Sequence, residues 1–160
     1  MTYAHHVTPA AAPEQRVAPT RCRPAPLAAE LRVGAMRLAR RLRRERSSTD
    51  ITDAQYSVLA GLDRRGPQSL RALADHENVQ PPSMTRTVTA LEEAGLARRT
   101  PHPDDGRQLL VVLTEAGTRH VHETRRQRDA WLAEQLAALS ADDRAVLARA
   151  AALLQEIATR

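Results

Sequence analysis

Residues 98 to 114, RRTPHPDDGRQLLVVLT, crowd charged side chains of both signs beside a strand-like apolar run. Such a segment could hold a metal ion or a phosphate, form a solvated hairpin tip, or serve as a wing that binds nucleic acid. The metal interpretation is weak, because His102, Asp104 and Asp105 stand on one loop and the sequence shows no second cluster of ligands. Asp104-Asp105-Gly106 suits a tight turn, since Asp tolerates turn conformations and Gly supplies a positive φ. The elements that position the segment must decide among the other uses.

The length and composition favour one mainly helical domain. The chain has 160 residues and only 2% aromatic side chains, so its core must be built from Leu, Val and Ala. No apolar stretch approaches the length of a membrane span. The N-terminal segment lacks the charged-then-apolar order of a secretory signal, and a cytoplasmic location is therefore the default expectation. The single cysteine, Cys22, excludes an internal disulfide and a multi-cysteine zinc site.

The charge of the chain permits an acidic partner but does not locate a binding face. All 24 basic residues are arginine, and the formal net charge is +5, which suits a partner such as DNA. The excess lies mainly in residues 1–50, which hold ten Arg against four acidic residues. Residues 51–114 hold seven Arg against eight acidic residues, so the binding function has to be sought in individual positions.

The N-terminal part of the chain changes character near residue 25. Residues 1–24 are rich in Pro and Ala and have no apolar period, which predicts a disordered tail. A helix is predicted over residues 25–46, because apolar side chains recur there at three- and four-residue steps. The polar cluster at residues 47–50 ends it. The apolar stripe of this helix consists of Leu27, Leu31, Ala35, Leu38 and Leu42.

Clear start and stop signals frame the next two helices. Thr52 is followed three residues later by Gln55, which is the pattern of a capping box, and Gly66-Pro67 stops the helix that this box begins. Ser69 can then cap a short third helix, SLRALADHE. A turn, ENVQ, separates this helix from the next.

A fourth helix and a hairpin follow. The helix PPSMTRTVTALEEAG begins with prolines, which suit a first turn because the missing N–H costs little there. Gly95 can supply the left-handed residue at its end. Residues 96–100 and 109–113 are predicted to form two strands around a long tip, PHPDDGRQ.

Two further helices complete the chain. Thr114 can cap a long helix from residue 115 to about 139, and Ser140 can cap a last helix that runs to about residue 159. The last helix carries an apolar face. That face consists of Leu147, Ala151, Leu154 and Ile157.

The order of helix, short helix, turn, helix and hairpin predicts a winged helix-turn-helix over about residues 52–114. In the fourth helix, Met84, Val88 and Leu91 form a narrow core stripe, and the opposite side is polar. A recognition helix places its N-terminal residues at base edges in the major groove, where short hydroxyls and an arginine can bind bases and phosphates. Alone, such a polar face more often belongs to an ordinary capped surface helix; the ordered combination of elements favours DNA binding. The residues predicted to contact DNA from this helix are Pro82, Ser83, Thr85, Arg86 and Thr89.

The segment SMTRTVTALEEAGLARRTPHPDDGRQLLVVLTEAG resembles the signature of the MarR family of bacterial transcription regulators. It is similar in the recognition helix, in the Leu-Glu-x-x-Gly-Leu helix end, in the Asp-x-Arg wing tip and in the Val-Leu-Thr-x-x-Gly exit into the next helix. The resemblance extends from about Leu27 to the C-terminus. It implies a mainly α fold with a small β-hairpin wing, in which a MarR-type domain spans residues 25–160.

The resemblance also assigns roles to the wing. In the family the wing arginine enters the minor groove, and the aspartate two residues earlier helps to hold the wing; these positions are Arg107 and Asp105 here. Because the carboxylate of Asp105 would repel phosphate, we expect a basic partner for it, either Arg98 or Arg99 on the facing strand or Arg107 itself. Arg98 and Arg99 are counted among the predicted DNA-binding residues.

A homodimer and an effector are further implications of the family. The first and the last two helices, about residues 25–46 and 115–159, are expected to intertwine with those of a second chain, and the dimer to bind a pseudo-palindromic operator as a repressor. An intramolecular bundle of these three helices is the alternative. Many relatives release DNA when a small aromatic or phenolic compound binds; Arg32, Tyr56 and Trp131 are the candidates for lining such a site.

Two other classes of protein compete with a transcription regulator. An enzyme has no support, because the sequence holds no nucleophile–histidine arrangement, phosphate loop or paired metal motif, and no cofactor is expected. A winged-helix module used only for protein contacts is the alternative function. Cys22 is flanked by Arg21 and Arg23, which favour a thiolate, but it precedes the first helix, and we interpret it as an exposed thiol without function.

Overall fold

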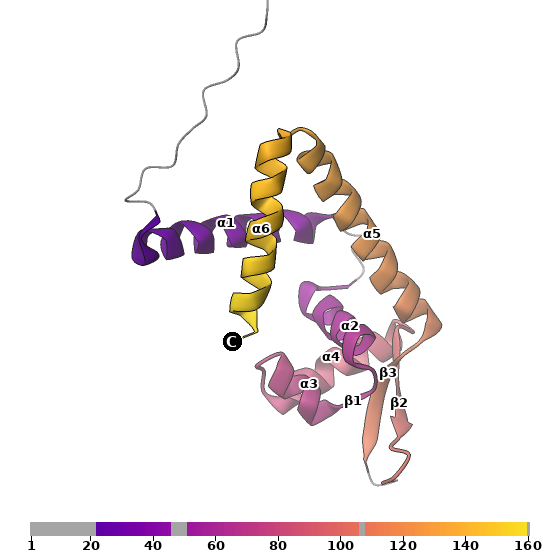
Figure 1. Cartoon of the computed structure of the whole chain (residues 1–160). Helices are drawn as coiled ribbons and strands as arrows, with labels where there is room; N and C mark the ends of the chain where they lie inside the picture. The colour runs from indigo at the N-terminus through magenta and orange to yellow at the C-terminus, as the bar shows by residue number, and fades with distance from the viewer. Residues whose placement is uncertain (1–21, 46–50, 106–107, 160) are drawn as a thin grey trace, which may run out of the picture. The chain divides into compact units, whose positions relative to one another are not determined.

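The computed structural model describes residues 22–45, 51–105 and 108–159. The chain divides into two compact units, Met1–Ala39 and Arg40–Arg160. The described part of the first unit belongs almost entirely to helix α1 (Pro24–Arg44), whose last residues fall in the second unit. All the other helices and strands belong to the second unit (Figure 1). The fold class predicted from the sequence, mainly α with a small β-hairpin wing, is confirmed.

The boundaries of the first helix differ slightly from the prediction. It begins at Pro24, because a proline is accommodated in a first turn, and it ends at Arg44 instead of residue 46. Most of the predicted tail, residues 1–21, and the polar cluster at residues 47–50 lie outside the described residues.

Helix α2 (Asp53–Arg65) has the predicted signals at both ends. The Gln55 N–H donates to Thr52 Oγ1 at 3.2 Å, and the Thr52 N–H donates to Gln55 Oε1 at 2.6 Å, which are the two reciprocal bonds of a capping box. At the other end Gly66 has a φ of +77°, a region that favours glycine, and its N–H donates to the Leu62 carbonyl at 2.8 Å.

A tight turn connects α3 (Leu70–His76) to α4 (Pro81–Glu93). Ser69 caps α3, as predicted, by accepting a hydrogen bond from the Ala72 N–H at 3.1 Å. In the turn Asn78 has a φ of +52°, which asparagine tolerates better than most residues. The two helices and α2 form the helix-turn-helix part of the second unit (Figure 1).

A three-stranded antiparallel sheet in the order β1-β3-β2 completes the winged core. The predicted hairpin is formed by β2 (Ala97–Pro101) and β3 (Leu109–Leu113), in the register Ala97↔Leu113 to Pro101↔Leu109. The third strand, β1 (Gln68–Ser69), was not predicted. Its two residues are too few to show an alternating pattern, and only the pairing with Val111 and Leu110 gives them an extended structure.

The core lies between α2, α3, α4, the sheet and the first half of α5 (Glu115–Ala137). Met84, Val88 and Leu91 are fully buried in it, which confirms the predicted core stripe of α4. Burying each such side chain stabilises the fold by about 1.5–3 kcal/mol, so this stripe fixes the rotation of α4 about its own axis. The other buried apolar residues are Ile51, Val58, Leu59, Leu62, Leu73, Ala74, Ala97, Val111 and Val121.

The end of α4, the hairpin and the start of α5 meet at one junction. Thr114 donates its N–H to the Leu96 carbonyl at 3.1 Å and its hydroxyl to the Gly95 carbonyl at 2.7 Å. Its hydroxyl oxygen also accepts from the Gly117 N–H at 3.0 Å, which is the predicted cap of α5. Gly95 has a φ of +69°, as the sequence predicted, and this left-handed residue turns the chain from α4 into β2.

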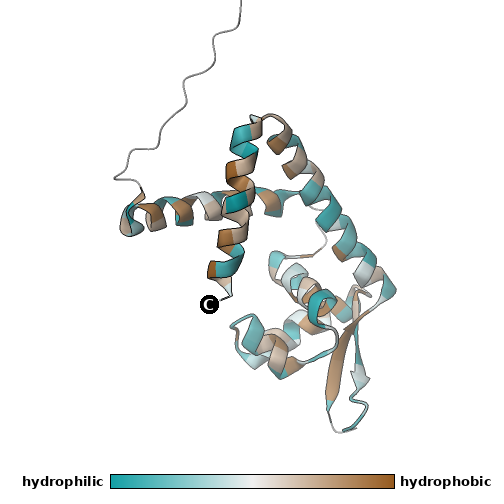
Figure 2. Cartoon of the chain, in the orientation of Figure 1, coloured by the Kyte–Doolittle hydropathy of each residue, from teal (hydrophilic) through white to brown (hydrophobic). Residues whose placement is uncertain are grey.

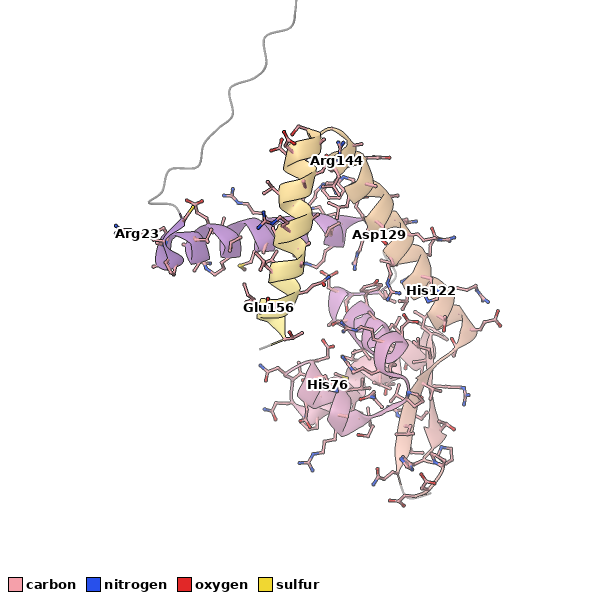
Figure 3. All side chains as sticks on the ribbon, in the orientation of Figure 1. Arg23, His76, His122, Asp129, Arg144 and Glu156 are labelled. Atoms are coloured by element: carbon pink, nitrogen blue, oxygen red, sulfur yellow. The ribbon has the colours of Figure 1, made fainter. Side chains whose placement is uncertain are left out.

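Polar and aromatic contacts join α5 to α2. The carboxylate of Asp63, with a side chain only 16% exposed, accepts from Arg125 Nη2 at 3.1 Å and lies 3.3 Å from His122 Nε2. His122 is labelled on α5 in Figure 3. The Arg128 guanidinium stacks over the Tyr56 ring at 4.3 Å from its centroid. The long helix is therefore held to the winged core by charged groups as well as by Val121.

Helices α1 and α6 (Ala141–Ala158) have no buried residue among those described. Ser140 caps α6, as predicted, by accepting from the Asp143 N–H at 3.1 Å. Figure 2 shows apolar and polar positions interleaved along both helices. None of the helices in the described part of the chain combines the length and the hydropathy that a bilayer span requires.

Gly117 is the position at which the junction tolerates no side chain. A Cβ atom there would lie 2.0 Å from the Leu96 carbonyl oxygen. We expect Gly117→Ala to lower the free energy of unfolding by about 1–3 kcal/mol, because the backbone of the junction must move apart. Denaturant unfolding followed by circular dichroism measures the change.

The matched control is Gly34→Ala in α1, where a Cβ would meet nothing within 4 Å. Replacing a glycine inside a helix should there be neutral or stabilising, by up to about 1 kcal/mol. Equal effects of the two substitutions on unfolding would show that the close approach at Gly117 does not matter for stability.

Candidate nucleic-acid interface

The exposed face of α4 carries the side chains that the sequence predicted for DNA contact. Because Met84, Val88 and Leu91 point into the core, the residues between them at helical spacing point outward. All five predicted residues of this helix are exposed, and four of them lie in its first two turns. They are Pro82, Ser83, Thr85, Arg86 and Thr89.

Local hydrogen bonds set the character of this face. The first turn has Pro81 and Pro82 at its start and no side-chain cap, so its remaining backbone N–H groups are not occupied by the side chain of Gln80. The Thr85 hydroxyl donates to the Pro81 carbonyl at 3.0 Å, which leaves its oxygen free to accept. Arg86 Nε lies 3.5 Å from the Pro82 carbonyl, a long contact that does not commit the guanidinium.

The hairpin extends away from the core beside α4 (Figure 1). Beyond the paired strands, two backbone hydrogen bonds still link the two sides of the hairpin. The His102 N–H donates to the Gln108 carbonyl and the Gln108 N–H donates to the Asp105 carbonyl, both at 2.9 Å. The Asp104 N–H donates to His102 Nδ1 at 3.1 Å. Asp105 thus stands in the tip, as predicted. Gly106 and Arg107 lie outside the described residues, so the minor-groove role of Arg107 stays a prediction.

The two strand arginines face in opposite directions, as successive residues of a strand must. Arg98 is exposed. Arg99 turns toward α4, where its Nη1 forms an ion pair with Glu92 and its backbone N–H donates to Glu92 Oε1 at 3.0 Å. The sequence had placed Arg99 among the candidate partners of Asp105; in the structure its guanidinium is held by Glu92.

His102, Asp104 and Asp105 are not grouped as the ligands of a metal ion. Within the described ranges there is no group of three or more His, Cys, Asp or Glu side chains that could hold a metal ion. The ring of His102 serves instead as an acceptor in the turn, through its bond from Asp104. Cys22 is an exposed free thiol just before α1.

Of the three residues proposed for an effector site, the structure places one at a pocket. Tyr56 lines a cavity of about 580 Å³ between the end of α1, α2 and α5. Trp131 is not among the lining residues; the Arg41 guanidinium covers its ring at 4.5 Å. Arg32 belongs to the other unit and is exposed on α1. The other residues that line the cavity are Leu42, Ala60, Asp63, Arg64, Arg125, Arg128, Asp129 and Leu132.

Sequence reasoning missed the residues that act across elements. Glu92 was treated as part of a helix-end motif, and Asp63, Arg125 and Arg128 received no role. Glu92 pairs with Arg99, seven residues away in the sequence, and Asp63 pairs with Arg125, 62 residues away. A single sequence gives no sign of which distant charges will meet, so only the alternation of strand faces could have indicated that Arg98 and Arg99 differ.

The helix-turn-helix, the exposed polar face of α4 and the adjoining hairpin define a winged helix-turn-helix DNA-binding protein. The model of the MarR family matches residues 51–109. An HTH-type transcriptional regulator from Mycobacterium tuberculosis is 44% identical over 128 residues, which cover 80% of this chain and 90% of the relative. An HTH-type transcriptional repressor from Bacillus subtilis is 30% identical, over 68% of this chain and 70% of that protein.

The structural comparison agrees. The structure of a MarR family protein from Bacillus stearothermophilus superposes with a TM-score of 0.74 at 26% identity, over 85% of this chain and 95% of that chain. The chain belongs to the MarR family, and it is a DNA-binding regulator of transcription.

Arg86 offers the most direct test of the recognition face, because it is the only arginine of α4. We expect Arg86→Ala to leave the unfolding free energy unchanged and to weaken binding to a duplex selected by the wild-type protein by about 1–3 kcal/mol, the worth of a bidentate base contact. Fluorescence anisotropy measures the affinity.

Arg119→Ala serves as the control, since it removes the same charge from α5, where Arg119 pairs with Glu115. Its effect on affinity should be small. An Arg86→Ala protein that is folded and binds the selected duplex as tightly as the wild type would show that this side of α4 does not face the bases.

Proposed function

We propose that this protein is a cytoplasmic homodimeric repressor that binds a pseudo-palindromic operator and releases it when a small anionic aromatic effector binds. It has no catalytic activity in this proposal. The observation that carries the dimer is the set of uncovered apolar side chains on the two terminal helices. The observation that supports an effector is the cavity beside Tyr56.

Helices α1 and α6 each carry exposed large apolar side chains, and contiguous exposed apolar surface marks an interaction site. Five large apolar side chains on each helix are at least 39% exposed. A second copy of the chain can bury them, and in a symmetric dimer the same surface serves both partners. On α1 they are Leu27, Leu31, Val33, Met36 and Leu38, and on α6 they are Val146, Leu147, Leu153, Leu154 and Ile157.

A dimer gives each operator half-site one α4 and one wing. Two recognition helices related by a twofold axis read an inverted repeat whose half-sites are about one helical turn apart, roughly 34–36 Å. The name of repressor belongs to the relative from Bacillus subtilis. It supports repression here in the simplest form, in which the bound dimer blocks the transcription machinery.

The cavity at Tyr56 suits an anionic aromatic compound. Three arginines and two aspartates line it, and Arg125 is engaged by Asp63. Arg128 offers a hydrogen-bond donor that an anion could use: its Nε is buried and has no hydrogen-bond partner among the described residues. A carboxylate or phenolate could pair with this donor while its ring packs against Tyr56.

Effector binding there would act on DNA through α2. The cavity is lined by residues of α2, in the winged core, and of α5, outside it. A compound that inserts between these helices competes with the Arg125–Asp63 pair and shifts the winged core relative to α5. The spacing of two recognition helices in a dimer would change with it, and operator affinity would fall.

The dimer is tested by placing a charge in the apolar face of α6. We expect wild-type protein to sediment as a dimer at micromolar concentration, and Leu154→Glu to sediment as a monomer, because an unpaired carboxylate cannot be buried in an interface. Ala148→Glu, which adds the same charge on the opposite side of the same helix, should leave the dimer intact. A wild-type protein that sediments as a monomer with and without DNA would contradict the proposal.

The effector site is tested with benzoate, and with benzyl alcohol as the uncharged control. We expect benzoate, but not benzyl alcohol, to lower the affinity of the wild-type protein for its selected duplex. Arg128→Met should bind the duplex normally and require at least about tenfold more benzoate, as expected when a charge-assisted hydrogen bond is lost. Equal responses of wild type and Arg128→Met would rule out this pocket.

A further inference from the structure

Glu92 and Arg99 connect the recognition helix to the wing. Glu92 stands in the last turn of α4, and Arg99 is the third residue of β2. The left-handed Gly95 reverses the chain between them, and the Leu96 N–H donates to the Leu91 carbonyl at 2.9 Å. This turn brings a carboxylate and a guanidinium that are seven residues apart in sequence to one place.

Both oxygens of the Glu92 carboxylate are used at this contact. Oε1 accepts from the Arg99 backbone N–H at 3.0 Å, and Oε2 pairs with Arg99 Nη1. Arg99 Nη2 also lies 3.4 Å from Thr89 Oγ1, one turn earlier on α4. The pair is partly buried, with side chains 25% and 26% exposed. One arginine thus joins β2 to two successive turns of the recognition helix.

This geometry does not suit a phosphate contact. An arginine that binds phosphate presents its fork of N–H donors to solvent. Arg99 directs both terminal nitrogens at α4, whereas its neighbour Arg98 is exposed. Glu92 would by itself repel DNA, and the ion pair with Arg99 cancels that charge at the edge of the interface.

We propose that Arg99 is a positioning residue: through Glu92 and Thr89 it fixes the angle between α4 and the hairpin, so that the helix and the wing can occupy adjacent grooves of one duplex together. The inference rests on the DNA-binding function stated above. It makes the Glu92–Arg99 pair a determinant of sequence discrimination without a contact to any base or phosphate.

The test is a double-mutant cycle with Arg99→Ala, Glu92→Ala and the double variant. Affinity is measured by anisotropy for two probes, a duplex that the full-length wild-type protein selects from a randomised pool and a duplex of scrambled sequence. We expect each single substitution to weaken binding to the selected duplex about tenfold and the double variant to be no worse, because all three lose one shared joint. The scrambled duplex should be affected much less.

The alternative, a phosphate contact by Arg99, predicts a different pattern of affinities. Removing the Glu92 charge would then tighten binding to both duplexes, and Arg99→Ala would cost the same with and without Glu92. Arg99→Lys separates the two roles again, since an ammonium can hold a phosphate but cannot reproduce a bidentate fork. We expect Arg99→Lys to lose discrimination almost as Arg99→Ala does.

Two controls keep the result interpretable. Glu93→Ala removes the same charge from the neighbouring, exposed position of α4 and should not weaken binding. Thermal unfolding checks that each variant is folded, and Glu92→Gln replaces Glu92→Ala if the latter is not. Additive losses, or tighter binding by either Glu92 variant, would overturn the positioning role. A wild-type protein that selects no duplex would overturn the DNA-binding function itself, and the inference with it.

Discussion

The burial of one narrow stripe of α4 determines how this protein can meet DNA. Met84, Val88 and Leu91 are fully enclosed by the core, and rotating the helix about its axis would expose them to water. Their side chains therefore decide which residues point outward. Because the stripe is narrow, most of the circumference of α4 is left for polar groups. A helix with a broader apolar face would have been held as firmly but would have had little left with which to contact DNA.

The position of the wing depends on that same helix. The turn at Gly95 connects α4 to the hairpin, and contacts on both sides of this turn hold the two together. At the base of the hairpin, Thr114 bonds to the carbonyls of Gly95 and Leu96, and α5 approaches so closely that Gly117 has no room for a side chain. On the strand, Arg99 reaches back to α4. The hairpin is thus attached to the recognition helix by backbone bonds, packing and an ion pair. Such joints suit an interface whose two parts must reach neighbouring grooves.

Charge acts in this protein through placement more than through quantity. The winged segment, residues 51–114, holds one more acidic residue than arginines, although the whole chain has a net charge of +5. What distinguishes the interface is that Arg86 and Arg98 are exposed, while the carboxylate of Glu92 is covered by Arg99. Away from DNA, Asp63 binds Arg125 in the same way. Local pairing can therefore leave exposed arginines at the interface of a segment that has no basic excess.

The sequence by itself determined the helices, the hairpin and the outward face of α4. Caps such as Thr52 and Thr114, the left-handed Gly95 and the apolar periodicity act over a few residues, so their signals can be read in order along the chain. The tertiary structure alone decided the contacts between distant residues. The strand β1 exists only through pairing with β3, and Arg99 meets Glu92 only because the chain turns at Gly95. An isolated arginine has the same chemistry wherever it stands; which carboxylate, ring or solvent it faces depends on packing that no local pattern records.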